Sequence, residues 1–274
     1  MKILNGSELA SYIKARQAKQ VRGLRQAWNV FPKLAIIQTS DSPVIDTYVR
    51  LKKAYAEDIL IDVESHKVNE DEALELIEQL NADESVHGII VQLPLGDISR
   101  TDELLEAVAP EKDVDALGSR AVLDPATPIA INWLLAGYNI DLSSKKIVIV
   151  GEGRLVGAPL ARMWRDSGYD VTVVGEPTDN LKTILQEADA VVAATGSAGL
   201  ITSDMLRPDS VVVDAGTSSE GGEIKGDVSP EVRERHDLTI TPEKGGVGPL
   251  TICALFDNVI RAARTTIPPD QESS

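Results

Sequence analysis

The sequence contains few cysteines, histidines and aromatic residues, and each shortage argues against a class of protein. A single cysteine, Cys253, cannot form an internal disulfide framework, which fits a reducing compartment. The three histidines lie far apart and lack the neighbouring cysteines or carboxylates of a zinc site, so we expect no metal. Aromatic residues make up 4% of a chain that is 43% hydrophobic, so the cores must consist mainly of Leu, Ile, Val and Ala.

Basic residues are also scarce relative to acidic ones. The 27 Lys and Arg face 43 Asp and Glu, which gives a formal net charge of -16. Such a surface repels nucleic acid and anionic lipid, so we expect neither a nucleic-acid nor a membrane partner. No apolar run is long enough to span a bilayer, and Glu8 and Lys14 interrupt the early segment where a signal peptide would lie. We therefore expect a soluble, cytoplasmic protein.

Strand and helix patterns alternate along the chain, whose 274 residues suggest about two domains. The first part predicts strands at 34–37, 61–68 and 86–92 and helices at 6–28, 44–59, 71–80 and 101–108. The second part predicts strands at 146–150, 171–174, 190–194, 211–214 and 239–241 and helices at 127–136, 155–167 and 249–264. Short buried strands that alternate with helices are typical of an α/β fold with parallel sheets.

The second half is organised around the glycine-rich turn Gly151-Glu152-Gly153-Arg154-Leu155-Val156-Gly157. A predicted strand precedes this turn and a predicted helix follows it, which is the context of a dinucleotide site. The glycines let the backbone approach a pyrophosphate, and the helix N-terminus supplies free N–H groups. The spacing is one residue longer than the usual fingerprint, so an ordinary strand-to-helix turn is the alternative.

Charged side chains near this turn bear on the choice between NAD and NADP. Glu176 lies at about the distance after the glycines where Rossmann domains place the acid that binds the ribose hydroxyls. A carboxylate there repels a 2′-phosphate, and Glu152 adds a second negative charge, whereas Arg154 is a local cation that opposes them. On these charges alone the sequence favours NAD.

Polar residues in the first half are candidates for chemistry. Tyr48 and Lys52 lie four residues apart on a predicted helix and share a face, and burial would allow Lys52 to act as a general acid or base. The alternative is a packed tyrosine beside a solvated lysine. Gln92 closes an apolar strand, where α/β sheets bind ligands, or it satisfies a loop hydrogen bond. Asp113 and Asp115 bind amino groups of a ligand or cap a turn.

Several motifs occur together and in order: Tyr48-Val49-Arg50-Leu51-Lys52, 86–95, Lys112-Asp113-Val114-Asp115, Val156-Gly157-Ala158-Pro159 and the glycine-rich loop 245–251. In these motifs the chain resembles the bifunctional methylenetetrahydrofolate dehydrogenase/cyclohydrolase family, over about residues 2 to 264. The resemblance implies two α/β domains around a cleft, the second of Rossmann type. The folate-binding catalytic domain would comprise 1–120 plus 250–274, and the NAD(P)-binding domain would comprise 121–249. A homodimer with a role in one-carbon metabolism and purine biosynthesis is also implied.

The family oxidises 5,10-methylenetetrahydrofolate with NAD(P) and hydrolyses the resulting methenyl compound to 10-formyltetrahydrofolate. The resemblance implies that Lys52 assists water attack and proton transfer and that Gln92 positions and tunes this lysine. It implies that Tyr48 stacks on the folate and that Asp115 binds the pterin ring. The implied folate-cleft lining is Gly246, Val247 and Pro249. The implied cofactor-binding residues are Gly151, Glu152, Gly153, Arg154, Val156, Gly157, Glu176 and Thr195.

The sequence also departs from the family's pattern. The loop after Asp115 is shorter, Ile45 stands where the family has Ser, and Ala126 stands where it usually has Cys. Glu152 and Glu176 occupy places where many NADP-using members carry basic residues, although NADP is the family's usual cofactor. Two alternatives stay open: a degenerate, non-catalytic folate- or nucleotide-binding protein, and a different Rossmann dehydrogenase.

Overall fold

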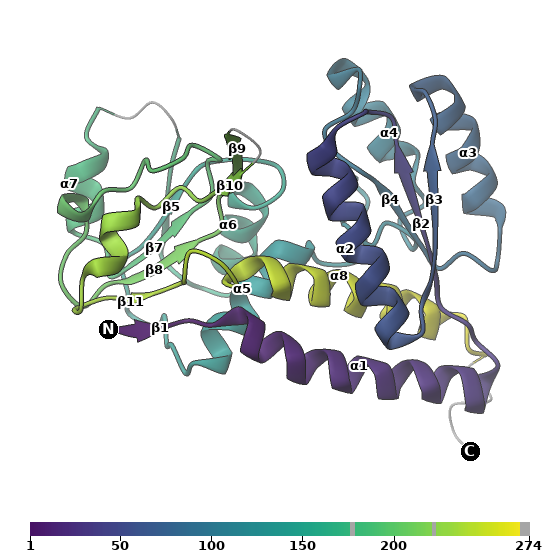
Figure 1. Cartoon of the computed structure of the whole chain (residues 1–274), viewed down its shortest axis with the longest axis horizontal. Coiled ribbons are helices and arrows are strands. Elements are labelled where there is room, and N and C mark those ends of the chain that lie inside the picture. The colour runs from purple at the N-terminus through teal and green to yellow at the C-terminus, as the bar shows by residue number, and fades with distance from the viewer. Residues whose placement is uncertain (176–178, 221–222, 269–274) are drawn as a thin grey trace. The chain divides into compact units, whose positions relative to one another are not determined.

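The computed structural model describes residues 1–175, 179–220 and 223–268 (Figure 1). The chain forms two compact units. Unit 1 comprises Met1–Ala10 and Thr127–Thr251, and unit 2 comprises Ser11–Ala126 and the chain from Ile252 onward. Both units contain a parallel sheet with helices, so the α/β class predicted from the alternating pattern is confirmed.

Unit 2 is built on a three-stranded parallel sheet in the order β3-β2-β4. The strands are β2 (Lys33–Gln38), β3 (Asp62–Lys67) and β4 (Gly88–Val91). The helices are α2 (Pro43–Ile59), α3 (Glu70–Ala82), η1 (Ile98–Arg100) and α4 (Thr101–Ala107), with most of α1 (Gly6–Trp28) and α8 (Val247–Thr265). The central strand β2 and the strand β4 are almost wholly apolar because both of their faces are buried.

Helices α3 and α4 cover one face of this sheet, and Figure 1 shows them side by side. Alternate residues of β2 and β4 point to this face, and they pack with the apolar stripes of the two helices in one cluster: Ala35, Ile37, Ala73, Ile77, Leu80, Ile89, Val91, Leu104 and Leu105. The start of α3 is fixed by a capping box at Asn69. The Asn69 side chain accepts from Glu72 N at 3.0 Å, and the Glu72 carboxylate accepts from Asn69 N at 3.1 Å.

Unit 1 contains a six-stranded parallel sheet in the order β1-β11-β8-β7-β5-β6. The strands are β1 (Lys2–Ile3), β5 (Ile147–Val150), β6 (Val171–Val174), β7 (Ala190–Ala193), β8 (Val211–Asp214) and β11 (Thr239–Ile240). The remaining elements are α5 (Ala126–Gly137), α6 (Gly157–Asp166), α7 (Leu181–Gln186), η2 (Ser203–Met205), η3 (Pro230–Glu234) and the hairpin β9 (Ser218–Glu220) with β10 (Glu223–Lys225). The strand order reverses between β5 and β7, and such a reversal is where α/β sheets bind their ligands.

The first ten residues lie in unit 1, which differs from the grouping of residues 1–120 suggested by the sequence. Strand β1 pairs in parallel with β11, and Leu4 N donates to Ile240 O at 2.9 Å. Leu4 is fully buried. A strand of two residues carries no detectable periodicity, so its attachment to the far end of the chain was not visible in the sequence.

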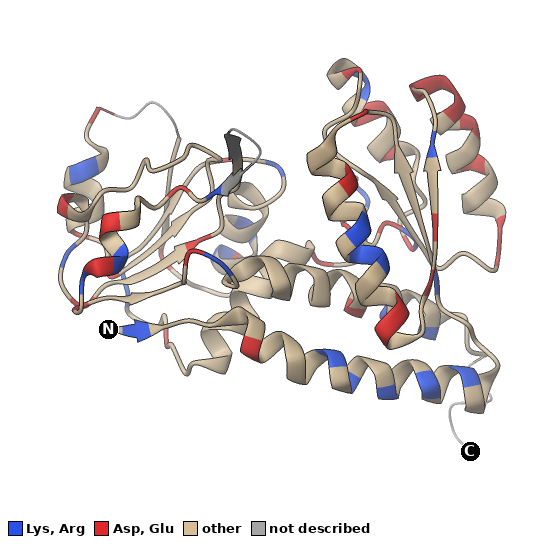
Figure 2. Cartoon of the chain, in the orientation of Figure 1, with Lys and Arg blue, Asp and Glu red and all other residues tan. Residues whose placement is uncertain are grey.

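The negative charge is spread unevenly over the helices. Figure 2 shows acidic residues on α3 and basic residues along α1, where Lys14 pairs with Asp58 and Arg16 with Asp257. None of the helices in the described part of the chain is long and apolar enough to cross a membrane. Within the same residues there is no group of three or more His, Cys, Asp or Glu arranged to hold a metal ion.

Candidate active site

Helix α2 presents Tyr48 and Lys52 one turn apart, and both side chains are half-buried. Pro43 opens this helix, and the buried residues Ile45 and Val49 anchor it. Lys52 Nζ donates to Gln92 Oε1 at 2.8 Å. The fold therefore brings together two of the predicted site residues that lie on different elements.

Hydrogen bonds to neighbouring main-chain carbonyls orient Gln92 and its side-chain amide. Gln92 N donates to Ile37 O at 2.8 Å, which extends the sheet pairing by one residue beyond β4. The side-chain Nε2 donates to Leu93 O at 3.1 Å. With its nitrogen engaged, the amide offers its oxygen to Lys52. Because a lysine can donate to that oxygen in both its charged and its neutral form, Gln92 holds the amine in place throughout a proton transfer.

Burial lowers the pKa of Lys52, and the nearby Asp115 carboxylate opposes this shift by favouring the charged amine. Desolvation is the larger of the two causes. An amine with a lowered pKa is partly neutral at a lower pH than an exposed lysine, so it can accept a proton. This outcome favours the acid–base interpretation of the Tyr48–Lys52 face over a solvated lysine.

The two aspartates of the segment 113–115 have different roles. Asp113 is 5% exposed, its Oδ2 accepts from Gly118 N at 2.8 Å, and burial raises its pKa to about 6. Asp113 therefore caps the following loop. Asp115 is half-buried and acts on the charge of Lys52, so it is the carboxylate of the pair that belongs to the candidate site.

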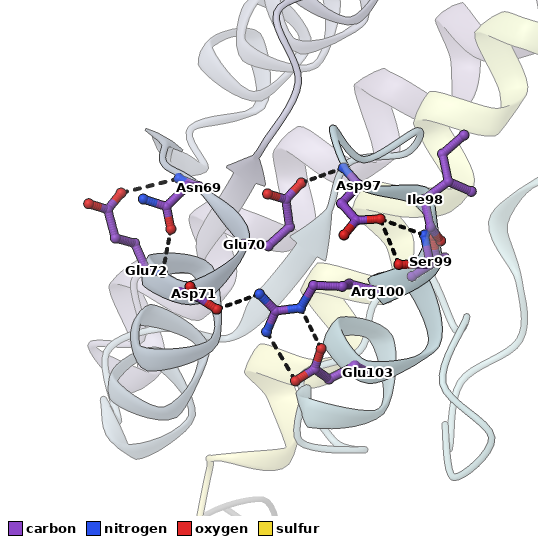
Figure 3. A network of polar contacts seen from close by, with 10 residues as sticks. Asn69, Glu70, Asp71, Glu72, Asp97, Ile98, Ser99, Arg100 and Glu103 are labelled. Carbon is purple, nitrogen blue, oxygen red and sulfur yellow. Dashed lines mark hydrogen bonds and ion pairs between the residues drawn. The ribbon is translucent and has the colours of Figure 1, made fainter.

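A polar network ties the loop after β4 to the start of α3 (Figure 3). Glu70 Oε1 accepts from Asp97 N at 2.8 Å, and Arg100 contacts Asp71 at 2.5 Å and Glu103 at 2.6 Å. Exposed ion pairs of this kind contribute little to stability individually. Their joint effect is to restrict the loop that directly follows the candidate site's glutamine.

In unit 1 the glycine-rich turn allows a very close approach between strand and helix. A Cβ on Gly151, whose φ is +106°, would lie 2.4 Å from Ala194 O. A Cβ on Gly157 would lie 1.9 Å from Gly151 O, so the first residue of α6 also has to be glycine. A Cβ on Gly153 would meet only Ala194 O, at 3.9 Å, which leaves that residue open to a ligand. These residues fit the pyrophosphate of a dinucleotide at the reversal point of the sheet.

Glu152 brings a carboxylate from this turn to the end of β6. Its Cδ lies 3.8 Å from the position that a Cβ on Gly175 would occupy, directly after the strand. The end of the second strand is where Rossmann domains bind the ribose. Arg154 is exposed in the same turn, and Val156 is the half-buried residue that precedes α6. Glu176 lies outside the described residues.

Thr195 follows β7 and is held by a buried carboxylate. Thr195 N and Oγ1 both donate to Asp227 Oδ2, at 2.6 and 2.9 Å. Asp227 is fully buried, and burial raises its pKa. Sequence reasoning missed Asp227. No local sequence pattern links Asp227 to Thr195, and the packing of its carboxylate 2.0 Å from the position of a Cβ on Gly216 is visible only in the fold.

Gly246, Val247 and Pro249 surround the start of α8 and belong to unit 1, whereas the Lys52 group belongs to unit 2. A Cβ on Gly6 would lie 1.8 Å from Gly246 O, and Ser7 N donates to Gly245 O at 3.0 Å. Close packing against the start of α1 therefore explains part of the glycine content of this loop, independently of any ligand.

Comparisons with known proteins cover both units. Residues 4–115 match the catalytic domain, and residues 125–267 the NAD(P)-binding domain, of the tetrahydrofolate dehydrogenase/cyclohydrolase family. Bifunctional protein FolD from Amoebophilus asiaticus is 37% identical over 290 residues, which cover 97% of each chain. The crystal structure of the bifunctional enzyme FolD from Campylobacter jejuni is 36% identical, has a TM-score of 0.91 and is matched over 97% of this chain and 99% of that chain. The Trypanosoma brucei enzyme, solved with NADP and an inhibitor, is 27% identical with a TM-score of 0.91, over 97% of this chain and 98% of its own. The chain therefore belongs to the tetrahydrofolate dehydrogenase/cyclohydrolase family.

Proposed function

We propose that this chain oxidises 5,10-methylenetetrahydrofolate with NAD(P) and then hydrolyses the 5,10-methenyl product to 10-formyltetrahydrofolate. The observation that carries the proposal is the 2.8 Å hydrogen bond from Lys52 Nζ to Gln92 Oε1, in a setting that lowers the lysine pKa. Hydride transfer alone does not require such a proton acceptor, whereas hydrolysis does. The glycine turn of unit 1 supplies the dinucleotide site that the oxidation needs.

We assign substrate binding to Tyr48 and Asp115. The tyrosine ring, half-buried one turn before the lysine, stacks on the pterin. The Asp115 carboxylate accepts hydrogen bonds from pterin N–H groups. A bound NAD(P) supplies the hydride acceptor, and Gly151, Gly153 and Gly157 hold its pyrophosphate.

In the hydrolysis, Lys52 takes a proton from the water that attacks the methenyl carbon. The resulting carbinol transfers its hydroxyl proton to N5 as the bond from that carbon to N5 breaks, which leaves the formyl group on N10, and the proton taken by Lys52 is released to solvent. The positive charge of the methenyl substrate favours the neutral amine further by like-charge repulsion. Gln92 keeps the amine directed at the reaction because its oxygen accepts a hydrogen bond in either protonation state.

Two assays test this function. Reduced-cofactor formation from 5,10-methylenetetrahydrofolate is measured with NAD and NADP in parallel, and methenyltetrahydrofolate hydrolysis is measured separately. Turnover in both assays supports the proposal. Tight folate binding without turnover would favour the degenerate binder instead. Ile45 and Ala126, which differ from the family's usual residues, are both buried, at 2% and 4% exposed. Their burial favours an effect on packing over a direct loss of chemistry.

We propose further that the enzyme prefers NAD because Glu152 repels a 2′-phosphate at the end of β6. Glu152→Arg should raise the ratio of kcat/KM with NADP to that with NAD by about tenfold or more, since each 1.4 kcal/mol is a factor of ten. Glu152→Gln should raise the ratio less. Glu187 is an exposed acid that pairs with Lys146, the residue directly before β5. The matched control Glu187→Arg should leave the ratio unchanged. An unchanged ratio in Glu152→Arg would contradict this assignment.

A pH profile tests the electrostatic coupling between Asp115 and Lys52. Cyclohydrolase kcat/KM should rise with pH through the Lys52 pKa, which lies below the ordinary lysine value of about 10.4. Asp115 raises that pKa, so Asp115→Asn should move the rising limb to lower pH. Glu111→Gln, which removes an exposed charge on the preceding turn, should not move it. A shift of the limb to higher pH in Asp115→Asn would contradict the coupling.

We propose that unit 2 binds the folate, that unit 1 binds the dinucleotide, and that the enzyme is a cytoplasmic homodimer. Among the described strands, β3 pairs only with β2 and leaves one edge of its sheet open to a second copy. Light scattering should report twice the chain mass of 29.4 kDa. A monomer at assay concentration would overturn the dimer.

A further inference from the structure

A buried asparagine on α8 holds both ends of the loop that carries Asp115. Asn258 is fully buried, and its Nδ2 donates to Val114 O at 2.9 Å and to Asp124 O at 2.8 Å. Val114 directly precedes Asp115, and Asp124 lies at the far end of the same loop. One amide group therefore uses both of its hydrogens to satisfy two carbonyls that the chain separates.

The rest of this loop is anchored at its middle. The Asp113 carboxylate accepts from Gly118 N, and Glu106 accepts from Ser119 N at 2.7 Å and from Ser119 Oγ at 2.8 Å. On the carboxyl side of Asp115, Ala116 N donates to Asp113 O at 3.2 Å.

Asp115 lies between a clamped residue and a strained one. On its carboxyl side, Ala116 has a φ of +56°, a left-handed conformation that is uncommon for a residue with a side chain. Such a conformation persists only where the surroundings impose it. On its amino side, the Val114 carbonyl is held by Asn258. The Asn258 contact therefore fixes the backbone on the amino side of Asp115, as the hydrogen bond from Ala116 N to Asp113 O does on its carboxyl side.

We propose that Asn258 is a positioning residue that sets the place of the Asp115 carboxylate, and through it the binding of the folate. The inference rests on the proposed role of Asp115 in folate binding. Asn258 touches no reacting atom. Without its amide, the buried Val114 carbonyl and the partly buried Asp124 carbonyl lose their donor, and the backbone on both sides of the loop has to shift to find another.

The first test compares two buried amides of unit 2 that both donate to main-chain carbonyls. Asn258→Leu keeps the approximate shape and removes the donors. Gln17→Leu is the matched control, because Gln17 is fully buried and donates to Cys253 O on α8 at 2.8 Å. Both variants should lower Tm. Only Asn258→Leu should raise the KM for 5,10-methylenetetrahydrofolate, by about tenfold, while the dinucleotide KM stays within about twofold.

A double-mutant cycle then distinguishes positioning from general destabilisation. In an Asp115→Asn background, Asn258→Leu should change the folate KM by less than about twofold, because its route of action is already removed. Asn258→Leu alone should also move the rising limb of the cyclohydrolase pH profile to lower pH, as Asp115→Asn does. Asp115 is the charged group that acts on Lys52, and the facing Gln92 is neutral.

The outcomes that overturn the inference are specific. The first is a folate KM in Asn258→Leu within about twofold of wild type. The second is a folate KM that Asn258→Leu raises by the same factor in the wild-type and in the Asp115→Asn background. If Asn258→Leu does not fold, Asn258→Ser, which keeps one hydroxyl donor, takes its place in the same cycle with an intermediate effect expected. Wild-type protein that turns over neither folate substrate would refute the proposed function itself, whereas active wild type with an additive cycle refutes only the role of Asn258.

Discussion

Replacement of Lys52 by methionine is expected to reduce cyclohydrolase turnover by about 100-fold or more, since general acid–base catalysis contributes roughly 10²–10⁴. Methionine has a similar length but accepts no proton, and it leaves Gln92 Oε1 without the donor that now lies at 2.8 Å. Dehydrogenase turnover should fall much less, because hydride transfer depends on the positioning of the two reactants more than on proton transfer. Both rates are measured on the same preparation, from methenyl- and methylenetetrahydrofolate respectively.

The neighbouring residue provides the control for this prediction. Lys53 follows on the same helix but is exposed, so Lys53→Met removes an equal charge outside the site. Both activities should stay at the wild-type level in this variant. An equal loss of both activities in Lys52→Met would contradict the division of labour, and full cyclohydrolase activity would remove Lys52 from the mechanism.

The Gly157→Ala variant is expected to lose dehydrogenase activity and to keep cyclohydrolase activity, the reverse of Lys52→Met. An added Cβ would lie 1.9 Å from Gly151 O and 2.8 Å from Gly151 C, which are backbone atoms that no rotamer change can move aside. The turn must therefore open, which displaces the N–H groups at the start of α6 from the pyrophosphate. We expect the dinucleotide Kd to rise by about tenfold or more, with a matching loss of dehydrogenase activity. Cofactor binding is followed by fluorescence titration.

Cyclohydrolase activity should survive in Gly157→Ala, because Lys52 and Gln92 belong to the other unit. The control is Gly23→Ala on α1, where an added Cβ meets nothing within 4 Å. It should leave dinucleotide binding unchanged, and it should stabilise the helix by up to about 1 kcal/mol. Wild-type dinucleotide affinity in Gly157→Ala would show that the glycine turn does not hold the cofactor.

Much of the fold was predictable because it depends on local patterns. The apolar run at β5 indicated a short buried strand, and the helix predicted at 71–80 lies within α3. Strand β1 was missed, because its two residues acquire a strand conformation only by pairing with β11 near the other end of the chain. Short elements of this kind have no periodic signal of their own.

Some features of the candidate site were likewise predictable from local sequence patterns, and others were not. Tyr48 and Lys52 share a face because helical geometry relates residues four apart, and the strand–turn–helix order placed the dinucleotide turn. The functional assignment also needed the order of several motifs along the chain. The residue types alone left open whether Asp113 or Asp115 belongs to the site, since both suit a turn or a ligand equally well, and only the resemblance to the family singled out Asp115.

The sequence by itself determined the α/β class, the glycine turn and the lysine-bearing helix, because these follow from periodicity and backbone preference within a few neighbouring residues. Only the tertiary structure decided that Gln92 Oε1 faces Lys52, that Asp113 caps a loop while Asp115 acts on the lysine, and that Asn258 clamps Val114 and Asp124. The physical reason is that burial and hydrogen-bond partners come from residues distant along the chain, and these set the pKa and the orientation of each polar group.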